Sequence, residues 1–219
     1  MVIIHTDTQF SHLETLIQKN DCIVFQVNSD TNLHTIENRI SLVYIHVDNE
    51  EFVLPINHSE SILKPKNITT EKTIWVLDKK SYQHNSFIKS NDIRDLNYSY
   101  YLKHNVPFEV DNYLTNAHQF YNRVHYDKPN INDVIPLMKH YEYLKEIRKN
   151  LQDYKIDNVE IILDVLYQIE RNGLHTIDKM VYSEYNPYTS TGRPSNRFGG
   201  MNFAALNKTD GSRKQFISR

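Results

Sequence analysis

Hydrophobic and polar residues alternate most clearly in the first third of the chain. The run Cys22–Val27 is apolar and β-branched, which predicts a strand buried on at least one face. Residues Arg39–Val47 alternate in character, and a polar turn at residues 48–50 separates them from a second run, Phe52–Ile56. These two runs predict a β-hairpin beside the first strand.

Further elements flank this hairpin. Phe10–Lys19 has helical spacing, and Thr73–Leu77 is a short apolar run typical of a strand. Asp92–His104 carries leucines and tyrosines at positions that suit a helix. Strand, hairpin, strand and helix together predict an α/β unit of ordinary domain size.

From Asp133 the apolar pattern becomes helical and continues to Leu151. A second apolar stripe follows, for which Asp157 or Asn158 would be the N-cap. Gly173 stands just beyond the end of this stripe, where a left-handed C-cap is expected. The change of period predicts two parts, an α/β domain over residues 1–132 and helices followed by an irregular segment over residues 133–219.

Composition limits the class of protein. With 219 residues, 39% of them hydrophobic, the chain is long enough to bury a core, so a disordered tail is excluded. The net charge of -2 argues against a uniformly basic coat for nucleic acid but permits a local basic patch. The single cysteine, Cys22, cannot form an intramolecular disulfide or a cysteine zinc site, and we expect it to be a small buried apolar residue.

The sequence also predicts where the protein works. No run of eighteen apolar residues occurs, and the first ten residues lack the basic and apolar pattern of an export signal. We therefore expect a cytoplasmic protein with no membrane partner. The frequent asparagines suggest an AT-rich viral or bacterial genome, and for a virus the compartment would be the host cytoplasm.

Glycine is confined to the last quarter of the chain. The five glycines are Gly173, Gly192, Gly199, Gly200 and Gly211. From Arg193 to the carboxyl end there are six basic residues and one acidic residue, Asp210. A stretch that combines turn-forming glycines with positive charge is the best candidate for a local functional site.

Three blocks in this stretch resemble a known family. They are TSTGRPSN from Thr189 to Asn196, NFAALN from Asn202 to Asn207, and RKQFI after Gly211. In this order they resemble family A DNA polymerases at the entry to the palm, where the family has T-x-T-G-R-L-S-S, P-N-L-Q-N-I-P and R-x-A-F. The segment LDVLYQIERNGL, from Leu163 to Leu174, is similar to the family's helix that leads into the thumb.

The resemblance implies a fold and an arrangement of domains. Residues 1–132 would be a degenerate 3′–5′ exonuclease-like domain of the ribonuclease-H-like α/β class. Residues 133–219 would hold thumb-stem helices and the irregular start of a polymerase palm. Only about fifteen residues separate Gly173 from Thr189, so the long thumb of the family would be truncated or rebuilt.

The same resemblance assigns DNA contacts. A Thr-Gly-Arg turn lets backbone approach a phosphate, and an arginine can reach minor-groove acceptors that every correct base pair offers. Arg193 would contact the primer side near its terminus, and Asn202 the minor-groove edge. Thr191, Gly192 and Ser195 would lie at the sugar–phosphate backbone, and Arg213 and Lys214 would add charge near phosphates. The implied partner is primer–template DNA.

The chemistry of nucleotidyl transfer needs two metal ions held by palm carboxylates. In the family both motifs would come after the position of Arg219, so we expect no catalytic residue, no metal ligand and no cofactor in this chain. Mg²⁺ would belong to the completed polymerase. The implied second partner is a C-terminal palm and fingers polypeptide, as in a split or truncated polymerase.

The exonuclease-like domain is expected to be inactive. The family's first strand carries Asp-x-Glu, whereas this chain has Gln26 and Asn28 there, and amides cannot replace two charged metal ligands. The Asp-x-Glu pair Asp48 and Glu50 falls in the hairpin turn, where solvated carboxylates are ordinary. Other acids that could form a remnant of the site are Asp30, Asp78, Asp92 and Asp95.

A function from another class fits part of the same sequence. The α/β domain and basic tail could serve a non-catalytic replication scaffold or a nucleic-acid-binding module. The coding sequence downstream separates the two hypotheses, because only the polymerase hypothesis requires an acidic palm motif and fingers-like helices there.

Overall fold

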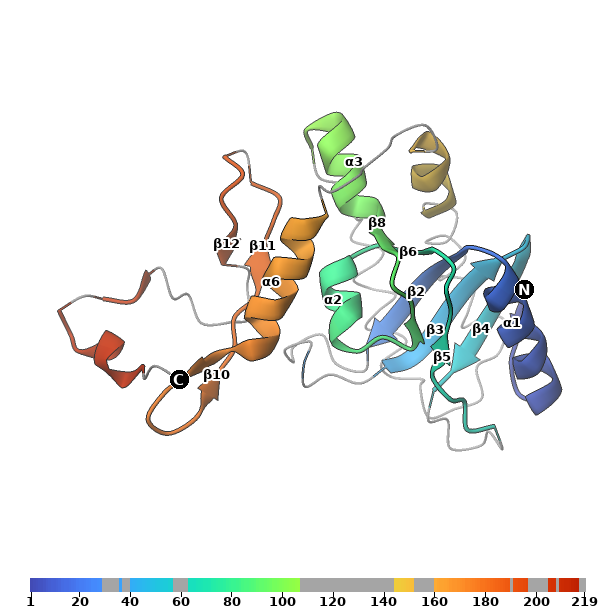
Figure 1. The fold of residues 1–219 in the computed structure, drawn as a ribbon, viewed down its shortest axis with the longest axis horizontal. Helices are drawn as coiled ribbons and strands as arrows, with labels where there is room; N and C mark the ends of the chain where they lie inside the picture. The colour runs from blue at the N-terminus through green and yellow to red at the C-terminus, as the bar shows by residue number, and fades with distance from the viewer. Residues whose placement is uncertain are drawn as a thin grey trace.

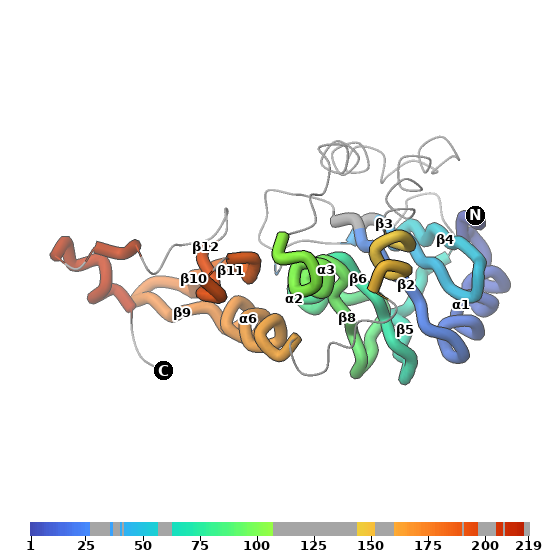
Figure 2. The backbone as a smooth tube through the Cα atoms, turned by 90° about the horizontal axis from the view of Figure 1, so that it is seen from above, coloured from blue at the N-terminus to red at the C-terminus, as the bar shows by residue number. Residues whose placement is uncertain are grey.

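The computed structural model describes residues 1–28, 36, 40–56, 63–106, 144–151, 160–189, 191–196, 205–207 and 209–216. These residues form a layered α/β body and, beside it, a helix that leads into a series of short hairpins (Figure 1). Figure 2, turned by a right angle, shows the same separation, with the hairpins extending away from the sheet. The molecule is therefore elongated along one axis.

A six-stranded mixed sheet forms the centre of the α/β body, with the order β1-β4-β3-β2-β6-β8. The strands are β1 (Val2–Ile3), β2 (Cys22–Asn28), β3 (Ile40–Val47), β4 (Glu50–Pro55), β6 (Ile74–Val76) and β8 (Ile93–Asp95). β3 is antiparallel to β2 and β4, whereas β2, β6 and β8 run parallel. This order and these directions are those of a ribonuclease-H-like α/β sheet, so the expected ribonuclease-H-like α/β class is confirmed for this part of the chain.

The predicted strands and hairpin are confirmed within one or two residues at their ends. β3 and β4 pair through Val47 and Glu50, with Asp48 and Asn49 between them. Both turn residues have positive φ, 50° and 62°. Two central residues with positive φ define a type I′ turn, whose twist matches that of paired strands.

Alternation along β2 separates two cores. Val24 and Cys22 face a cluster that includes α1 (Asp7–Lys19), whereas Ile23 and Phe25 face a second cluster that includes the helical residues 144–150. The sheet is therefore covered on both faces, in agreement with the continuous apolar run of Cys22–Phe25. Cys22 is buried as expected, and burial raises the pKa of its thiol to about 12.

The first helix begins earlier than its apolar spacing predicts. α1 starts at Asp7, three residues before the expected Phe10, because Thr6 and Gln9 form a capping box. The Gln9 backbone amide donates to the Thr6 hydroxyl, and the Thr6 amide donates to the Gln9 side chain. These reciprocal bonds satisfy amides that a helix start leaves without partners.

The single helix expected over Asp92–His104 is wrong in its first part. Ile93–Asp95 forms β8, and α3 (Leu96–His104) starts only after Asp95. The carboxylate of Asp95 accepts from the Tyr98 backbone amide at 2.7 Å and so caps the helix. α2 (Lys79–His84), which the sequence analysis did not predict, is capped in the same way by Asp78.

The later helices lie where they were expected, but the caps of the second one differ from the expectation. Of the helix expected over Asp133–Leu151, residues 144–150 are helical and the earlier part lies outside the described residues. The N-cap of the next helix is Glu160, without a side-chain capping bond, so the expectation of Asp157 or Asn158 at that position is wrong. α6 (Ile161–Asn172) follows Glu160 and ends at the expected C-cap, Gly173. Gly173 has a positive φ of 58° but a ψ of -170°, so the position is confirmed and the expected left-handed helical conformation is not.

Short pairings complete the chain. β5 (Ile68–Thr69) pairs with β7 (Ile88–Lys89), β9 (Leu174–His175) with β10 (Met180–Val181), and β11 (Tyr185–Asn186) with β12 (Ser195–Asn196), and the 3₁₀ helix η2 spans Ser212–Gln215. The predicted domain boundary near residue 132 lies outside the described residues. None of the helices in the described part combines the length and apolar character needed to cross a bilayer.

Candidate nucleic-acid interface

The Thr-Gly-Arg segment forms a closed turn at the end of a short hairpin. The Gly192 amide donates to the Thr189 carbonyl at 2.9 Å, and the Thr189 hydroxyl donates to the Arg193 carbonyl at 2.8 Å. Gly192 has a φ of 67°, in the region that glycine adopts without a steric penalty. The turn is thus fixed by bonds between residues of the motif itself.

The turn connects two paired strands, β11 and β12. Tyr185 and Asn186 in β11 pair with Asn196 and Ser195 in β12. The Asn196 side-chain amide also donates to the hydroxyl of Ser183, which is buried, at 2.7 Å. We call residues 185–196 the TGR hairpin, and its base is tied to the preceding segment through this buried bond.

The TGR hairpin forms an open pocket of about 400 Å³. Its lining consists of Tyr185, Thr189, Thr191 and residues 193–196. An arginine, a tyrosine, a serine and two threonines therefore line one concave surface, and the hydroxyl of one of them, Thr189, is already bonded within the turn. Groups of this kind donate hydrogen bonds to phosphate and sugar oxygens and provide a face for a ring.

Arg193 is exposed at this pocket. Its side chain has no hydrogen bond or ion pair to any other residue in the described part of the chain. A guanidinium offers five donors in a planar arrangement and carries its charge throughout the physiological pH range. Arg193 is therefore available to an acceptor outside the chain.

The structure brings together four of the seven residues expected at the interface. Thr191, Gly192, Arg193 and Ser195 lie in the TGR hairpin. Arg213 and Lys214 lie on η2, which is attached elsewhere, because the Ile177 amide of the β9–β10 loop donates to the Gln215 carbonyl. Asn202 lies outside the described residues.

Arg213 is exposed but bonded within its own segment. Its Nε and a terminal nitrogen donate to the Leu206 carbonyl at 3.2 and 3.1 Å. Lys214 beside it is also exposed. The two residues therefore form a second basic position on η2, separate from the pocket.

Four further residues line the pocket without any sequence pattern that assigned them to the site: Tyr185, Thr189, Pro194 and Asn196. Asn196 and Tyr185 face each other only because β11 and β12 pair, and strands of two residues leave no measurable period. The turn-forming glycine between them was the only signal of a hairpin here.

The strand that would carry exonuclease carboxylates has a structural amide instead. The Gln26 side chain accepts from the Phe87 backbone amide at 2.7 Å and donates to the Asn85 carbonyl at 3.0 Å. Both ends of the amide are thus used to hold the loop after α2 against β2. Asn28 lies at the end of β2, opposite Ile40.

The other acids expected near that strand have structural roles where they are described. Glu50 of the hairpin turn lies 3.2 Å from Nε2 of His12, and Asp92 bonds to Thr73 and Arg94. Asp30 lies outside the described residues. Within the described ranges, no group of three or more His, Cys, Asp or Glu is placed to hold a metal ion.

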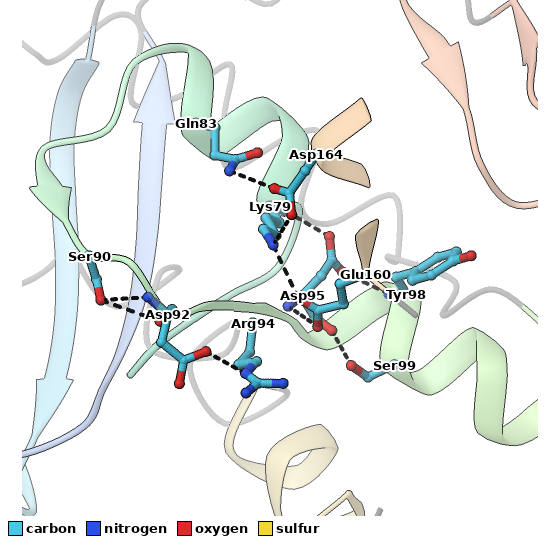
Figure 3. A network of polar contacts seen from close by, with 10 residues as sticks. All are labelled: Lys79, Gln83, Ser90, Asp92, Arg94, Asp95, Tyr98, Ser99, Glu160 and Asp164. Atoms are coloured by element: carbon cyan, nitrogen blue, oxygen red, sulfur yellow. Dashed lines mark hydrogen bonds and ion pairs between the residues drawn. The ribbon is translucent and has the colours of Figure 1, made fainter. Parts of the chain in front are cut away.

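Asp95 lies at the centre of a buried polar network (Figure 3). Its carboxylate accepts from the Lys79 backbone amide, and its own amide donates to Glu160 at 2.9 Å. Lys79 in turn lies 3.5 Å from the Glu160 carboxylate and 3.0 Å from that of Asp164. The network joins β8, α2, α3 and α6.

Burial governs the titration of these acids. Desolvation raises the pKa of Asp95 well above its ordinary value, the nearby carboxylate of Asp78 adds to the shift, and the two backbone amides oppose it. Desolvation also raises the pKa of Glu160, against the opposing bond from the Asp95 amide and the charge of Lys79. Burial therefore raises the pKa of both acids, while their hydrogen bonds join four elements of the fold.

Comparisons with known proteins found distant structural matches. No protein-family model and no curated protein matches the chain. A crystal structure of the EXO domain of Nibbler from Aedes aegypti aligns with 15% identity over 75% of this chain and 94% of that chain, with a TM-score of 0.48. The class of the protein is defined by its own strand order, that of a ribonuclease-H-like α/β domain.

Proposed function

We propose that this chain is the part of a family A DNA polymerase that grips the primer–template duplex through the TGR hairpin. The observation that carries the proposal is the exposed Arg193 side chain, without a described partner, at a pocket on a closed glycine turn. In this proposal the guanidinium enters the minor groove near the primer terminus. Thr191 and Ser195 face the sugar–phosphate backbone.

Contact in the minor groove explains how the protein could bind a duplex of any base sequence. Every correct pair presents a purine N3 or a pyrimidine O2 at equivalent places in that groove. A donor fixed at one position therefore finds an acceptor for any correct pair and loses it when a mismatch displaces the bases. The closed turn supports this role, because a mobile arginine would give affinity without geometric discrimination.

Catalysis would reside in a second part of the enzyme. The palm and fingers polypeptide would hold Mg²⁺, which supplies charge stabilisation at the transferred phosphoryl group. The exonuclease-like domain would not hydrolyse DNA, because Gln26 is bonded to backbone on both sides. The basic residues of η2, Arg213 and Lys214, would lie near phosphates further along the duplex.

Fluorescence anisotropy of a labelled primer–template duplex tests the grip. The parent chain should bind with an affinity that falls steeply as salt rises, since phosphate contacts release counterions. Arg193→Ala should weaken binding about tenfold, in the range of one charged hydrogen bond. Arg171→Ala, which removes an exposed arginine from α6, is the charge-matched control and should bind like the parent. Equal affinity of Arg193→Ala and the parent would refute the proposal.

Reconstitution distinguishes the polymerase from the alternative, a non-catalytic replication scaffold or nucleic-acid-binding module. A mixture of this chain with a palm and fingers polypeptide, Mg²⁺ and nucleotides should extend a primer, and Arg193→Ala should extend it more slowly. Duplex binding together with no extension by any such mixture would favour the binding module.

A further inference from the structure

The TGR hairpin is attached to the exonuclease-like domain at a buried carboxylate on α6. Glu170 is 0% exposed, and its Oε1 lies 2.6 Å from Nζ of Lys80, which is 2% exposed. Its Oε2 lies 3.1 Å from Nε2 of His84, another fully buried side chain. Lys80 and His84 both belong to α2, so the carboxylate fixes α6 to the helix beside the sheet.

The same carboxylate continues the connection to the pocket. Oε1 of Glu170 accepts from the backbone amide of Tyr185 at 2.6 Å. Tyr185 begins β11 and its side chain lines the pocket where Arg193 is exposed. One buried side chain therefore bonds to α2 on one side and to the first residue of the TGR hairpin on the other.

A second attachment reaches the turn itself. The Tyr101 hydroxyl on α3 donates to the Thr189 carbonyl at 3.0 Å, and the same carbonyl accepts from Gly192. Around this bond the ring of Tyr188 packs against Tyr98 and Tyr101, with centroids 6.2 and 5.7 Å apart. α3 thus contacts the hairpin directly at Thr189, whereas α2 is linked to its first residue, Tyr185, through Glu170 of α6.

We propose that Tyr101 and Glu170 are positioning residues for duplex binding. Through them the exonuclease-like domain holds the TGR hairpin in one orientation. This inference rests on the proposed function of Arg193 and goes beyond it. The domain needs no metal site for such a role, because it acts through α2 and α3, which are fixed by buried contacts of their own. A hydrolytically inactive domain would then still determine the affinity of the grip.

Positioning and general stabilisation make different predictions. A variant that only unfolds part of the population lowers binding by the same factor whether or not Arg193 is present. A variant that releases the hairpin makes the Arg193 contact itself weaker, so its effect shrinks once Arg193 is gone. A double-mutant cycle measures this difference directly.

The cycle uses Tyr101→Phe, which keeps the ring and removes only the hydroxyl. Its matched control is Tyr98→Phe, on the same helix and in the same tyrosine cluster, whose hydroxyl has no hydrogen bond to another described residue. Each variant is combined with Arg193→Ala, and the dissociation constant for the labelled primer–template duplex is measured by anisotropy. Thermal unfolding of each variant verifies that it is folded.

We expect Tyr101→Phe to raise the dissociation constant about three- to tenfold, as loss of a neutral hydrogen bond does. It should raise the constant much less in the Arg193→Ala background, and Tyr98→Phe should have little effect in either. Glu170→Gln, which keeps an acceptor for Tyr185 but loses the charge that pairs with Lys80, should show the same coupling to Arg193.

The results separate the two proposals. If Arg193→Ala binds like the parent, the proposed function fails. If Arg193→Ala weakens binding but Tyr101→Phe and Glu170→Gln either bind like the parent or lower affinity by equal factors in both backgrounds, the positioning proposal alone is overturned.

Discussion

The backbone amide of Asp95 donates to the Glu160 carboxylate at 2.9 Å, which joins the last strand of the sheet to the residue that precedes α6. The carboxylate of Asp95 meanwhile accepts from the amides of Lys79 and Tyr98, at the starts of α2 and α3. Three helices therefore begin within hydrogen-bond reach of one buried pair of acids. This pair fixes the direction in which α6 leaves the α/β body.

Acidification should strengthen this junction. Desolvation raises the pKa of Asp95 above its ordinary 3.8 and that of Glu160 above 4.5, so between those values and the raised ones the folded chain holds protons that the unfolded chain has lost. Because the folded state binds more protons there, the contribution of the pair to stability is largest at low pH and is lost as pH rises through the raised values.

The pH dependence is measured by urea unfolding of the parent and of Asp95→Asn between about pH 5 and about pH 8. The free energy of unfolding of the parent should rise relative to that of the variant as pH falls. Parallel curves for the two proteins would show that Asp95 does not titrate in this window.

Removing the cation that faces Glu170 should destabilise the fold strongly. Lys80→Met leaves a carboxylate buried with only His84 and a backbone amide as partners, and breaking a buried ion pair costs about 3–5 kcal/mol. Denaturant unfolding gives the loss. Arg171→Met, an exposed site on α6, should change stability by no more than about 0.5 kcal/mol. A similar small change for Lys80→Met would contradict the burial of this pair.

The exonuclease-like domain should release no nucleotides from 3′-labelled DNA in Mg²⁺ or Mn²⁺. The side chain of Gln26 is bonded to Asn85 and Phe87, and it supplies no charge to a metal ion. Gln26→Glu should lower the free energy of unfolding by about 1–3 kcal/mol, because a carboxylate cannot donate to the Asn85 carbonyl. Metal-dependent release by the parent chain would overturn the structural role of this amide.

Substitutions at Gly192 test whether the closed turn matters for binding. A Cβ at this position would meet nothing within 4 Å, so Gly192→Ala acts only through its φ of 67° and should cost about 1–2 kcal/mol. Gly192→Ala should therefore also bind the primer–template duplex more weakly than the parent. Gly192→Asn is the matched variant, because asparagine tolerates the left-handed region, and it should retain more of the affinity. Equal affinities for both variants and the parent would show that the turn conformation is not needed.

Local patterns were sufficient to predict the centre of the sheet. Cys22–Val27 is a continuous apolar run, and the first strand of the hairpin after it is long enough for a period of two to be visible. These segments coincide with β2, β3 and β4. β8 was missed because it has only three residues and α3 follows it directly in the sequence. Asp95 is both the last residue of the strand and the N-cap of the helix. Elements of two or three residues carry no period of their own.

The contacts that support the candidate site could not be predicted from sequence. Lys80 and Glu170 are 90 positions apart, and adjacent lysines on a six-residue helix are typical of a solvated surface. Arg148 lies over the ring of Trp75, with its Cζ 5.4 Å from the ring centroid, although the two residues are far apart in the sequence. Such pairings depend on how α2, α6 and residues 144–151 pack, which the tertiary fold decides.

The most direct test of the grip compares matched and mismatched primer termini. Dissociation constants are measured by anisotropy for duplexes of several sequences, each with a paired and with a mispaired primer end, using the parent and Arg193→Ala. The parent should bind all matched duplexes alike and mispaired ones about tenfold more weakly, and Arg193→Ala should lose this difference. If Arg193→Ala discriminates against mispaired ends as well as the parent does, the assignment of Arg193 to the minor groove is wrong.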